Sequence, residues 1–183
     1  DLAGPADVFM AANQCWCDRG KKPAYRTSFV GPVANPDTAT GVGLRVGSLN
    51  QIRGAIDTLV VPGGMDFGEA ELDPRAAAWI RRRWQRIRRV VSICSGAFVL
   101  ADAGVLAGRR VTTHWRELER LGEIVPDATV ERDALYVKDG PVYTSAGITA
   151  GIDLALALVE EDLGPDLAVE VARILVMFLH RPG

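Results

Sequence analysis

Short apolar runs alternate along the chain with longer stretches in which apolar residues recur every three or four positions. The short runs predict strands and the longer stretches predict helices, because side chains repeat every 2 residues in a strand and about every 3.6 in a helix. The predicted strands are residues 25–30, 42–46, 57–61, 90–93, 110–113, 129–132, 135–137 and 142–145. The predicted helices are residues 2–18, 73 to about 88, 97–103, 114–121, 148–163 and 166–180.

Strands and helices alternate in this prediction, and the strands at 57–61 and 90–93 are apolar throughout. That combination is typical of a parallel sheet covered by helices on both faces. We therefore expect one α/β domain over residues 1–183, with a three-layer, doubly wound and mostly parallel sheet. Asp139 and Gly140 predict a hairpin between the last two strands. Such a sheet needs a central first strand, which we expect to be missing from this chain unless residues 25–30 take its place.

The composition and charge narrow the classes of partner. Of the 183 residues 48% are hydrophobic, enough for a sizeable core, and the net charge is −2. That charge argues against a nucleic-acid surface spread over the domain, because phosphate binding needs clustered positive charge. Residues 81–89 are mostly arginine, but the apolar residues among them fit one buried helical face, so we expect solvated arginines. No apolar run has membrane-spanning length, so we expect no membrane partner.

The cysteines and histidines give little support for a disulfide or a metal site. The three cysteines are Cys15, Cys17 and Cys94, and an odd number does not predict a disulfide framework. A reducing, cytoplasmic location is therefore expected. Cys15 and Cys17 have C-x-C spacing and the chain holds two histidines, so we expect no metal and no other cofactor.

Cys94 lies between the strand predicted at 90–93 and the helix predicted at 97–103. A strand that turns directly into a helix beside small residues, here Ser95 and Gly96, is typical of a nucleophile elbow. The amino terminus of the helix offers free N–H groups and partial positive charge, which lower the pKa of a thiol and favour the thiolate. The alternative is a small buried residue that fills the strand end, and the residues alone leave both open.

Gly63 and Gly64 follow the strand predicted at 57–61, and His114 follows the strand predicted at 110–113. Open parallel sheets place their sites at the carboxyl ends of the strands, so these residues are expected near Cys94. The N–H groups of a glycine pair can approach a ligand closely, and with the Ser95 amide they would form an oxyanion hole. The alternative for the glycine pair is a simple tight turn.

Four segments resemble, in order, segments of the DJ-1/PfpI superfamily, the class I glutamine-amidotransferase-like fold. They are DLAGPADVF at 1–9, LVVPGG at 59–64, VSICSGAFVLADAGVLAGRRVTTHW at 91–115 and YTSAGITAGIDLALALVE at 143–160. The resemblance implies a flavodoxin-like sheet. Within the superfamily, the segments are most similar to the branch shared by isonitrile hydratases and the amino-terminal domains of AraC-type regulators.

The resemblance implies a role for each matching residue. Cys94 matches the elbow cysteine, and Asp1 matches the acid beside it, which would exchange a hydrogen bond with the thiol or orient a substrate. Ser95 matches a hydroxyl residue of isonitrile hydratases and stands where the family's proteases carry a histidine, so protease activity is not expected. His114 matches a histidine near the pocket; its alternative is a capping or core role, and it could act as a base only within reach of Cys94 or a ligand.

The segment AVEVARILVMFLHRPG at 168–183 resembles the final helix of the regulator branch. We therefore expect the ligand-sensing and dimerising domain of an AraC-type regulator, with a cysteine-containing pocket for a small molecule. DNA would be bound only through a C-terminal helix-turn-helix domain absent from this chain. The apolar residues of this segment would belong to the core or to a homodimer surface.

Two enzymatic alternatives remain open. Asp1, Cys94 and Ser95 together would suit an isonitrile hydratase-like enzyme, a cysteine-dependent lyase that adds water to a small substrate. A redox or glyoxal-handling protein similar to DJ-1 would depend on Cys94 alone.

Overall fold

The computed structural model describes residues 1–38, 40–64, 73–177, 181 and 183. Within them, the central sheet has the strand order β3 (Thr58–Val61), β4 (Arg89–Ile93), β8 (Val142–Ser145) and β7 (Tyr136–Asp139). The first three strands run parallel, and β7 pairs antiparallel with β8 through the predicted hairpin. Two short parallel pairs lie beside this sheet: β1 (Val30–Gly31) with β2 (Gly47–Ser48), and β5 (Arg110–Val111) with β6 (Thr129–Val130).

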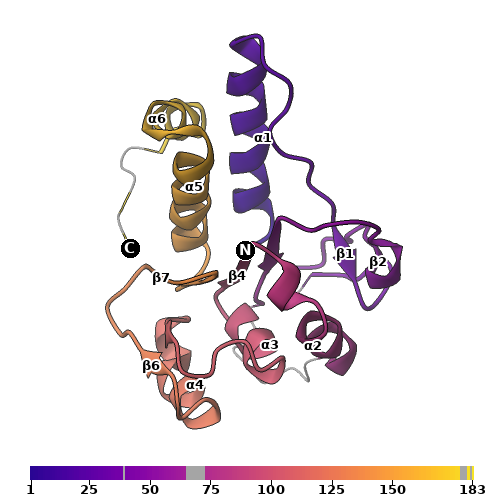
Figure 1. Cartoon of the computed structure of the whole chain (residues 1–183), viewed down its shortest axis with the longest axis vertical. Helices are drawn as coiled ribbons and strands as arrows, with labels where there is room; N and C mark the ends of the chain where they lie inside the picture. Colours follow the sequence, from indigo (N-terminus) through magenta and orange to yellow (C-terminus); the bar gives the residue numbers. More distant parts are fainter. Residues whose placement is uncertain (39, 65–72, 178–180, 182) are drawn as a thin grey trace.

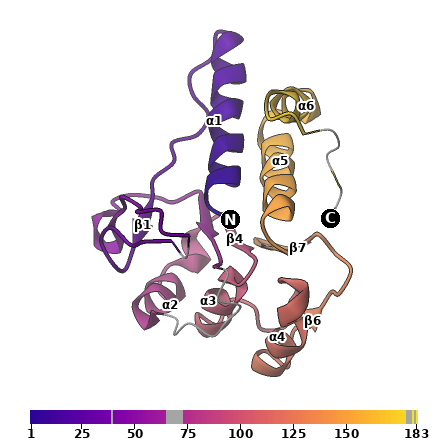
Figure 2. The ribbon, with the colours of Figure 1, turned by 180° about the vertical axis from the view of Figure 1, so that it is seen from behind.

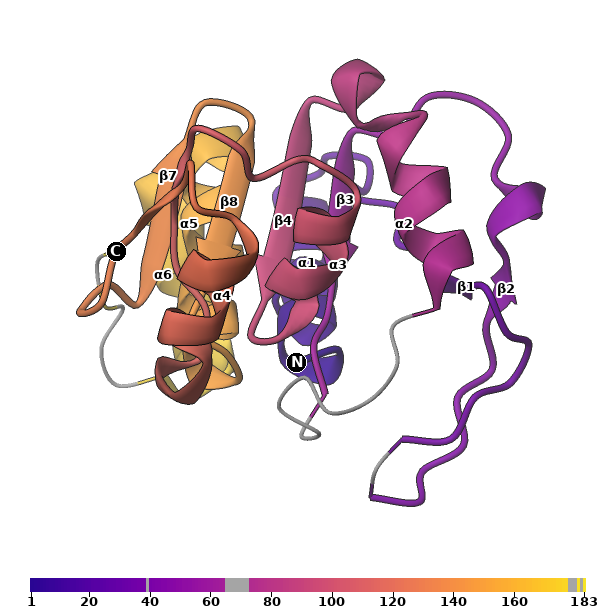
Figure 3. The same ribbon diagram turned by 90° about the horizontal axis from the view of Figure 1, so that it is seen from below.

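Helices cover both faces of the sheet, as Figure 3 shows. One face carries α1 (Ala3–Asp18), α5 (Thr149–Leu163) and α6 (Pro165–Ile174), and α1 and α5 lie side by side in Figures 1 and 2. The other face carries α2 (Pro74–Arg81), α3 (Gly96–Asp102) and α4 (Leu118–Ile124). The predicted three-layer α/β architecture is therefore confirmed.

Strand β4 separates two hydrophobic cores, and every residue of the strand is buried. Val91 and Ile93 pack into the core below α1, α5 and α6, while Val90 packs into the core below α2, α3 and α4. Because successive side chains of a strand point to opposite faces, a continuous apolar run fits a strand buried on both sides. The same arrangement fixes the end of β4, and with it Cys94, between the two helical layers.

The predictions for residues 25–46 were largely wrong. Only Val30 of the predicted strand at 25–30 is in a strand, and β1 pairs with β2 outside the central sheet, so residues 25–30 do not take a central place. Residues 42–46 instead fold back on residues 36–38. Leu44 N–H donates to Pro36 O at 2.8 Å, and Gly41 allows the turn with φ +79°.

Helix α2 begins as predicted but ends early. Asp73 caps it by accepting the Arg75 N–H at 2.9 Å, and Pro74 occupies its first position. The helix stops at Arg81, and a 3₁₀ turn, η2 (Trp84–Arg86), leads into β4 instead of the predicted helix to about residue 88. Most arginines of 81–89 are exposed as expected, but Arg89 is buried because β4 carries it into the protein.

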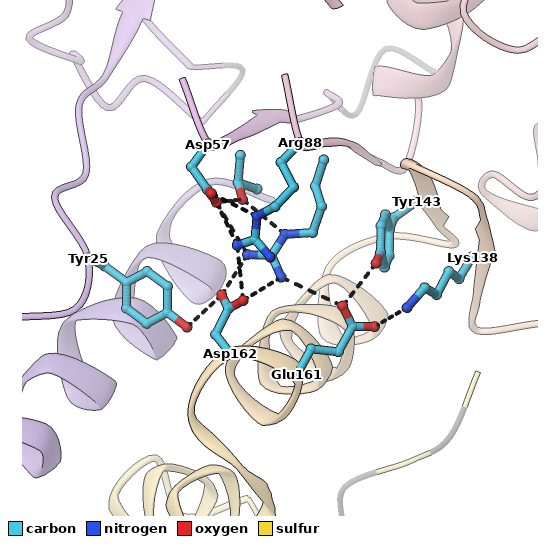
Figure 4. Close-up of polar contacts among 9 residues, drawn as sticks. Tyr25, Asp57, Arg88, Lys138, Tyr143, Glu161 and Asp162 are labelled. Atoms are coloured by element: carbon cyan, nitrogen blue, oxygen red, sulfur yellow. Dashed lines mark hydrogen bonds and ion pairs between the residues drawn. The ribbon is translucent and has the colours of Figure 1, made fainter. Parts of the chain in front are cut away.

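Arg89 lies in a polar cluster at the amino ends of β3 and β4, shown in Figure 4. We call it the basal cluster; its members are Tyr25, Asp57, Thr58, Arg88, Arg89, Lys138, Tyr143, Glu161 and Asp162. Arg89 pairs with Asp162 at 2.6 Å, and Tyr25 donates its hydroxyl to the same carboxylate at 3.0 Å. Burial and the Asp162 charge raise the pKa of the Tyr25 hydroxyl. The cluster therefore ties the carboxyl end of α5 to the sheet.

Helix α6 is shorter than predicted, because α-helical geometry ends at Ile174, while residues 178–180 of the prediction lie outside the described residues. Its apolar residues divide between two environments. Ala172 is buried in the core, whereas Val169, Ile174 and Val176 are exposed. Some apolar residues of the segment therefore belong to the core and others to the surface, whereas the prediction offered these as alternatives for the whole set.

Candidate functional site

Cys94 forms the turn between β4 and α3, as predicted. Its φ is +54°, in the left-handed region that residues other than glycine rarely adopt. The turn leaves no space for larger neighbours: a Cβ on Gly63 would lie 2.6 Å from the Ser95 nitrogen, and a Cβ on Gly96 would collide with the Val61 carbonyl. The small residues beside Cys94 are thus required by the close approach of β3 to the turn.

The structure brings the predicted strand ends together around Cys94. The Cys94 N–H donates to Ser145 O at 3.0 Å, which continues the β4–β8 pairing into the turn. Thr113, just after β5, donates its hydroxyl to Cys94 O at 2.8 Å. The Gly64 N–H donates to Ser95 Oγ at 2.9 Å. The cysteine turn is therefore held by three separate segments of chain.

Asp1 lies at the same edge of the sheet, but its carboxylate binds backbone amides. Its Oδ2 accepts the Gly63 N–H at 3.2 Å and its Oδ1 accepts the Ile148 N–H at 2.8 Å. Among the hydrogen bonds of the described residues, none joins Asp1 to the Cys94 thiol. The carboxylate thus connects the end of β3 to the start of α5.

The segment Gly147–Ile148 covers Cys94, and the sequence reasoning missed it. A Cβ on Gly147 would lie 2.9 Å from Cys94 Cβ and 3.1 Å from its Sγ, so only glycine fits there. Ile148 has φ +35°, which costs about 1–3 kcal/mol for a residue with a side chain and must be held by its surroundings. The Asp1 carboxylate supplies one such contact. Gly147 was the available signal in the sequence, since it comes two residues after the strand at 142–145.

Cys94 is 4% exposed, and this burial corrects the prediction for its ionisation. Burial raises the pKa of the thiol, and the Ser95 N–H, which would stabilise the thiolate, offsets only part of that effect. The charge of Glu117, itself buried, raises the pKa further. Burial therefore shifts the pKa of the thiol upward, whereas the helix amino terminus was expected to lower it.

The predicted oxyanion hole is occupied by acceptors of the protein itself. The Gly63 amide is bound by Asp1, the Gly64 amide by Ser95 Oγ, and the Ser95 amide faces the Cys94 sulfur. An oxyanion hole needs donors aimed at the developing charge of a substrate. These amides instead fix the relative positions of Asp1, Ser95 and Cys94.

His114 caps the 3₁₀ turn η3 (Trp115–Glu117) by accepting the Arg116 N–H at 3.4 Å on Nδ1. Burial, followed by the charge of Arg116, lowers the pKa of its imidazole. No hydrogen bond joins it to Cys94 in the described part of the chain. The described contacts therefore give His114 a capping role, and a role toward a ligand stays a prediction.

Metal-binding groups and a surface cavity also bear on the choice of site. Among the described residues, no group of three or more His, Cys, Asp or Glu side chains could hold a metal ion. A cavity of about 580 Å³ lies away from Cys94, along β7; it is lined by Arg110, residues 133–138 and Gly183. None of the predicted site residues lines this cavity.

Comparison with known proteins then places the chain in a family. The DJ-1/PfpI family profile matches residues 37–161, which include Cys94, Ser95, Gly63, Gly64 and His114. The chain belongs to the DJ-1/PfpI family. This family membership confirms the resemblance of the elbow region. None of the described helices is both long enough and apolar enough to cross a membrane.

The relatives matched within the DJ-1/PfpI family include an enzyme and transcriptional regulators. Isonitrile hydratase from Pseudomonas putida is 34% identical over 92% of this chain and 68% of its own length. The HTH-type regulator CdhR from Pseudomonas aeruginosa is 39% identical over 69% of this chain, and GlxA from Rhizobium meliloti is 40% identical over 59%. The matches cover 37% and 32% of those two regulators, so the chain spans about a third of their length.

Solved structures show the same DJ-1/PfpI fold. A ThiJ/PfpI family protein from Pseudomonas syringae superposes with a TM-score of 0.79 over the whole chain and 72% of its own length, at 24% identity. An AraC family transcriptional regulator from Pseudomonas putida superposes with a TM-score of 0.80 over 95% of this chain and 91% of its own, at 22% identity.

Proposed function

We propose that residues 1–183 form one domain that senses a small ligand and dimerises within an AraC-type transcription regulator. The observation that carries this proposal is the 39–40% identity to the regulators CdhR and GlxA. The match covers about a third of each regulator, which is the expected share of one domain. DNA would then be bound by a helix-turn-helix domain elsewhere in the full-length protein.

In this proposal the site around Cys94 binds the ligand. Its elements suit a sensor because they couple several segments: Asp1 before α1, Gly63 after β3 and Ile148 before α5 meet at one carboxylate. A ligand that displaces one of these contacts would move the others. The neutral, covered thiol is compatible with a contact residue that need not turn over a substrate.

The test is made on the native full-length polypeptide. We expect a helix-turn-helix domain after Gly183, and we expect that polypeptide to bind DNA as a dimer in a gel-shift assay. A native polypeptide without a DNA-binding domain on either side of these residues would exclude the regulator.

The alternative function is an isonitrile hydratase-like enzyme, favoured by the 34% identity to isonitrile hydratase over 92% of the chain. In such a reaction the Cys94 thiolate would attack the isonitrile carbon and form a C–S bond. The same carbon would take up a proton to give a thioimidate, and water would then add across its C=N bond, the hydroxyl going to the carbon and the proton to the nitrogen. The C–S bond would break to release the formamide and the thiol.

An assay with simple isonitriles separates the two functions. The purified chain and its Cys94→Ala variant would be compared for formamide production by mass spectrometry, with Cys15→Ala as the control for a cysteine outside the site. Turnover that depends on Cys94 supports the enzyme. Equal and negligible turnover in all three proteins excludes it and leaves the sensor.

A further inference from the structure

Arg181 is bound to the first turn of α5, although it lies at the far end of the chain. Its guanidinium donates to Asp153 Oδ2 from Nε at 3.1 Å and from Nη2 at 2.7 Å, and Nη2 also reaches Thr149 Oγ1 at 3.0 Å. The Arg181 N–H donates to Asp153 Oδ1 at 3.2 Å. One residue near the carboxyl end therefore makes four hydrogen bonds to a single helical turn.

The carboxylate of Asp153 is fully buried, with 0% of the residue exposed. A buried carboxylate is stabilised only where charged or polar partners replace its lost water, so the guanidinium, which donates from Nε and Nη2 to the single oxygen Oδ2, is a strong anchor. Asp153 and Thr149 lie four residues apart and share one face of α5, which lets one guanidinium reach both. The carboxyl-terminal anchor thus consists of Arg181, Asp153 and Thr149.

The same helical turn is continuous with the cover of Cys94. Ile148, the residue before Thr149, is the strained residue that donates to Asp1, and Gly147 before it contacts the Cys94 side chain. The first turn of α5 therefore has the cysteine site on one side and Arg181 on the other. We expect a displacement of Gly147 from Cys94 to be passed on to Thr149, which lies two residues further along the chain.

We propose that Arg181 is a positioning residue that couples the state of the Cys94 site to the carboxyl-terminal end of the domain. The inference rests on the proposed sensing function, because it names how occupancy of that site reaches Arg181. With the anchor in place, α5 holds Gly147 over the thiol. With the thiol modified or the site occupied, the first turn of α5 shifts and Arg181 is released. Because such coupling is reciprocal, loss of the anchor must also expose the thiol.

The test measures the alkylation of Cys94 by iodoacetamide, followed by mass spectrometry of the peptides. We expect Arg181→Ala to increase the rate at Cys94 by about fivefold or more, the lower range of coupling between two sites. Arg181→Lys keeps the positive charge but loses the contact of two guanidinium nitrogens with Asp153. The alkylation rate of Cys94 in this variant should therefore lie between the rates of the unchanged chain and of Arg181→Ala. Arg19→Ala is the matched control, because it removes an exposed arginine–carboxylate pair with Glu170.

The rate at the buried Cys15 in the same chain distinguishes local from global effects. An equal increase at Cys15 and Cys94 in Arg181→Ala would mean general loosening and would overturn the proposal, as would an unchanged rate at Cys94. The reciprocal measurement needs no variant at Arg181. After alkylation of Cys94, in a chain whose other two cysteines are replaced by serine, hydrogen exchange at the Arg181 amide should accelerate by a similar factor.

Unchanged exchange at Arg181 after alkylation would overturn the coupling even if the Arg181 variants fail to fold. These measurements use no ligand and no DNA, so their outcome is independent of the DNA-binding test of the regulator. A protein could show coupling between Arg181 and Cys94 and still lack a DNA-binding domain. It could equally bind DNA without showing that coupling.

Discussion

Burial is the largest influence on the pKa of Cys94. The residue lies at the amino end of a helix and faces the Ser95 amide, and both features favour a thiolate. The cover provided by Gly147 excludes water from the sulfur, and the loss of hydration has the larger effect. The reactivity of this thiol is therefore controlled by access to it.

The raised pKa predicts the pH dependence of alkylation at Cys94. A thiol with a raised pKa holds less thiolate at any pH below that value, so alkylation is slow at neutral pH and its rate rises at higher pH than for a free cysteine peptide. The measurement is the rate of iodoacetamide modification at Cys94 from pH 6 to about 10, where the ordinary thiol titrates near 8.5. A midpoint at or below that of the free peptide would contradict the effect of burial.

Gly147→Ala is predicted to destabilise the fold by about 2–4 kcal/mol, because the new Cβ meets Cys94 and the backbone has a φ that disfavours side chains. Urea unfolding measures the change. Gly54→Ala is the control: Gly54 has φ +92°, and a Cβ there would meet no atom within 4 Å. That variant should lose about 1–2 kcal/mol from the backbone alone. Equal losses in the two variants would show that contact with Cys94 contributes nothing.

Residues placed by strand ends could be predicted from the sequence, and residues placed by tertiary contacts could not. Cys94, Ser95 and Gly63 follow recognisable apolar strands, so the sheet itself brings them together. Ile148 carries no such signal, since a β-branched residue with positive φ is stabilised only by contacts that form after folding. The ionisation of Cys94 was predicted wrongly for the same reason, because its cover comes from a segment more than fifty residues away in sequence.

At the level of elements, the basal cluster fixes the carboxyl end of α5, which carries three consecutive acidic residues at 160–162. Acidic side chains are unfavourable at the carboxyl end of a helix, because they add to its partial negative charge. Arg88, Arg89 and Lys138 compensate that charge; Arg88 lies just before β4, Arg89 begins β4 and Lys138 lies in β7. The helix is thus held at one end by this cluster and at the other by the contacts around Ile148.

Arg89→Ala and Arg88→Ala make a matched pair of tests for this cluster. Arg89 is buried and its loss leaves Asp162 with less compensation inside the protein, so we expect a loss of about 3–5 kcal/mol. Arg88 pairs with Asp57 and Asp162 from an exposed position. Its loss should lower the free energy of unfolding by about 1 kcal/mol or less. Urea unfolding of both variants checks the difference, and similar losses would contradict the role of burial.

The element predictions succeeded where an apolar pattern and a terminal signal agreed. Helix α2 began at Asp73 and Pro74 as predicted, because capping depends on adjacent residues only. The strand predicted at 42–46 failed because its glycines let the chain turn back onto residues 36–38, a local pairing that the pattern does not distinguish from a sheet.

At the scale of the whole molecule, α6 leaves apolar side chains uncovered. Val169 and Ile174 are 52% and 53% exposed, although the helix is otherwise packed against α1 and α5. Exposed apolar residues on one helix suit a protein–protein contact, and a stable dimer buries about 800 Å² on each partner. Under the proposed function, we expect α6 to contribute to the homodimer surface.

The double variant Val169→Glu, Ile174→Glu is predicted to convert the dimer to a monomer, because two charges on each partner would be desolvated in the interface. Sedimentation velocity measures the state. Ile124→Glu is the control, since Ile124 is 49% exposed on α4, in the helical layer on the other side of the sheet. A dimer that survives the double variant would place the interface elsewhere.

The left-handed backbone at Cys94 creates a conflict between the stability of the fold and the presence of the thiol. Glycine would adopt that φ without strain, whereas any side chain there costs about 1–2 kcal/mol. Selection for thermal stability alone would therefore favour glycine at position 94. Glycine at position 94 is expected to raise the free energy of unfolding, but it would remove the side chain on which both proposed functions of the site depend.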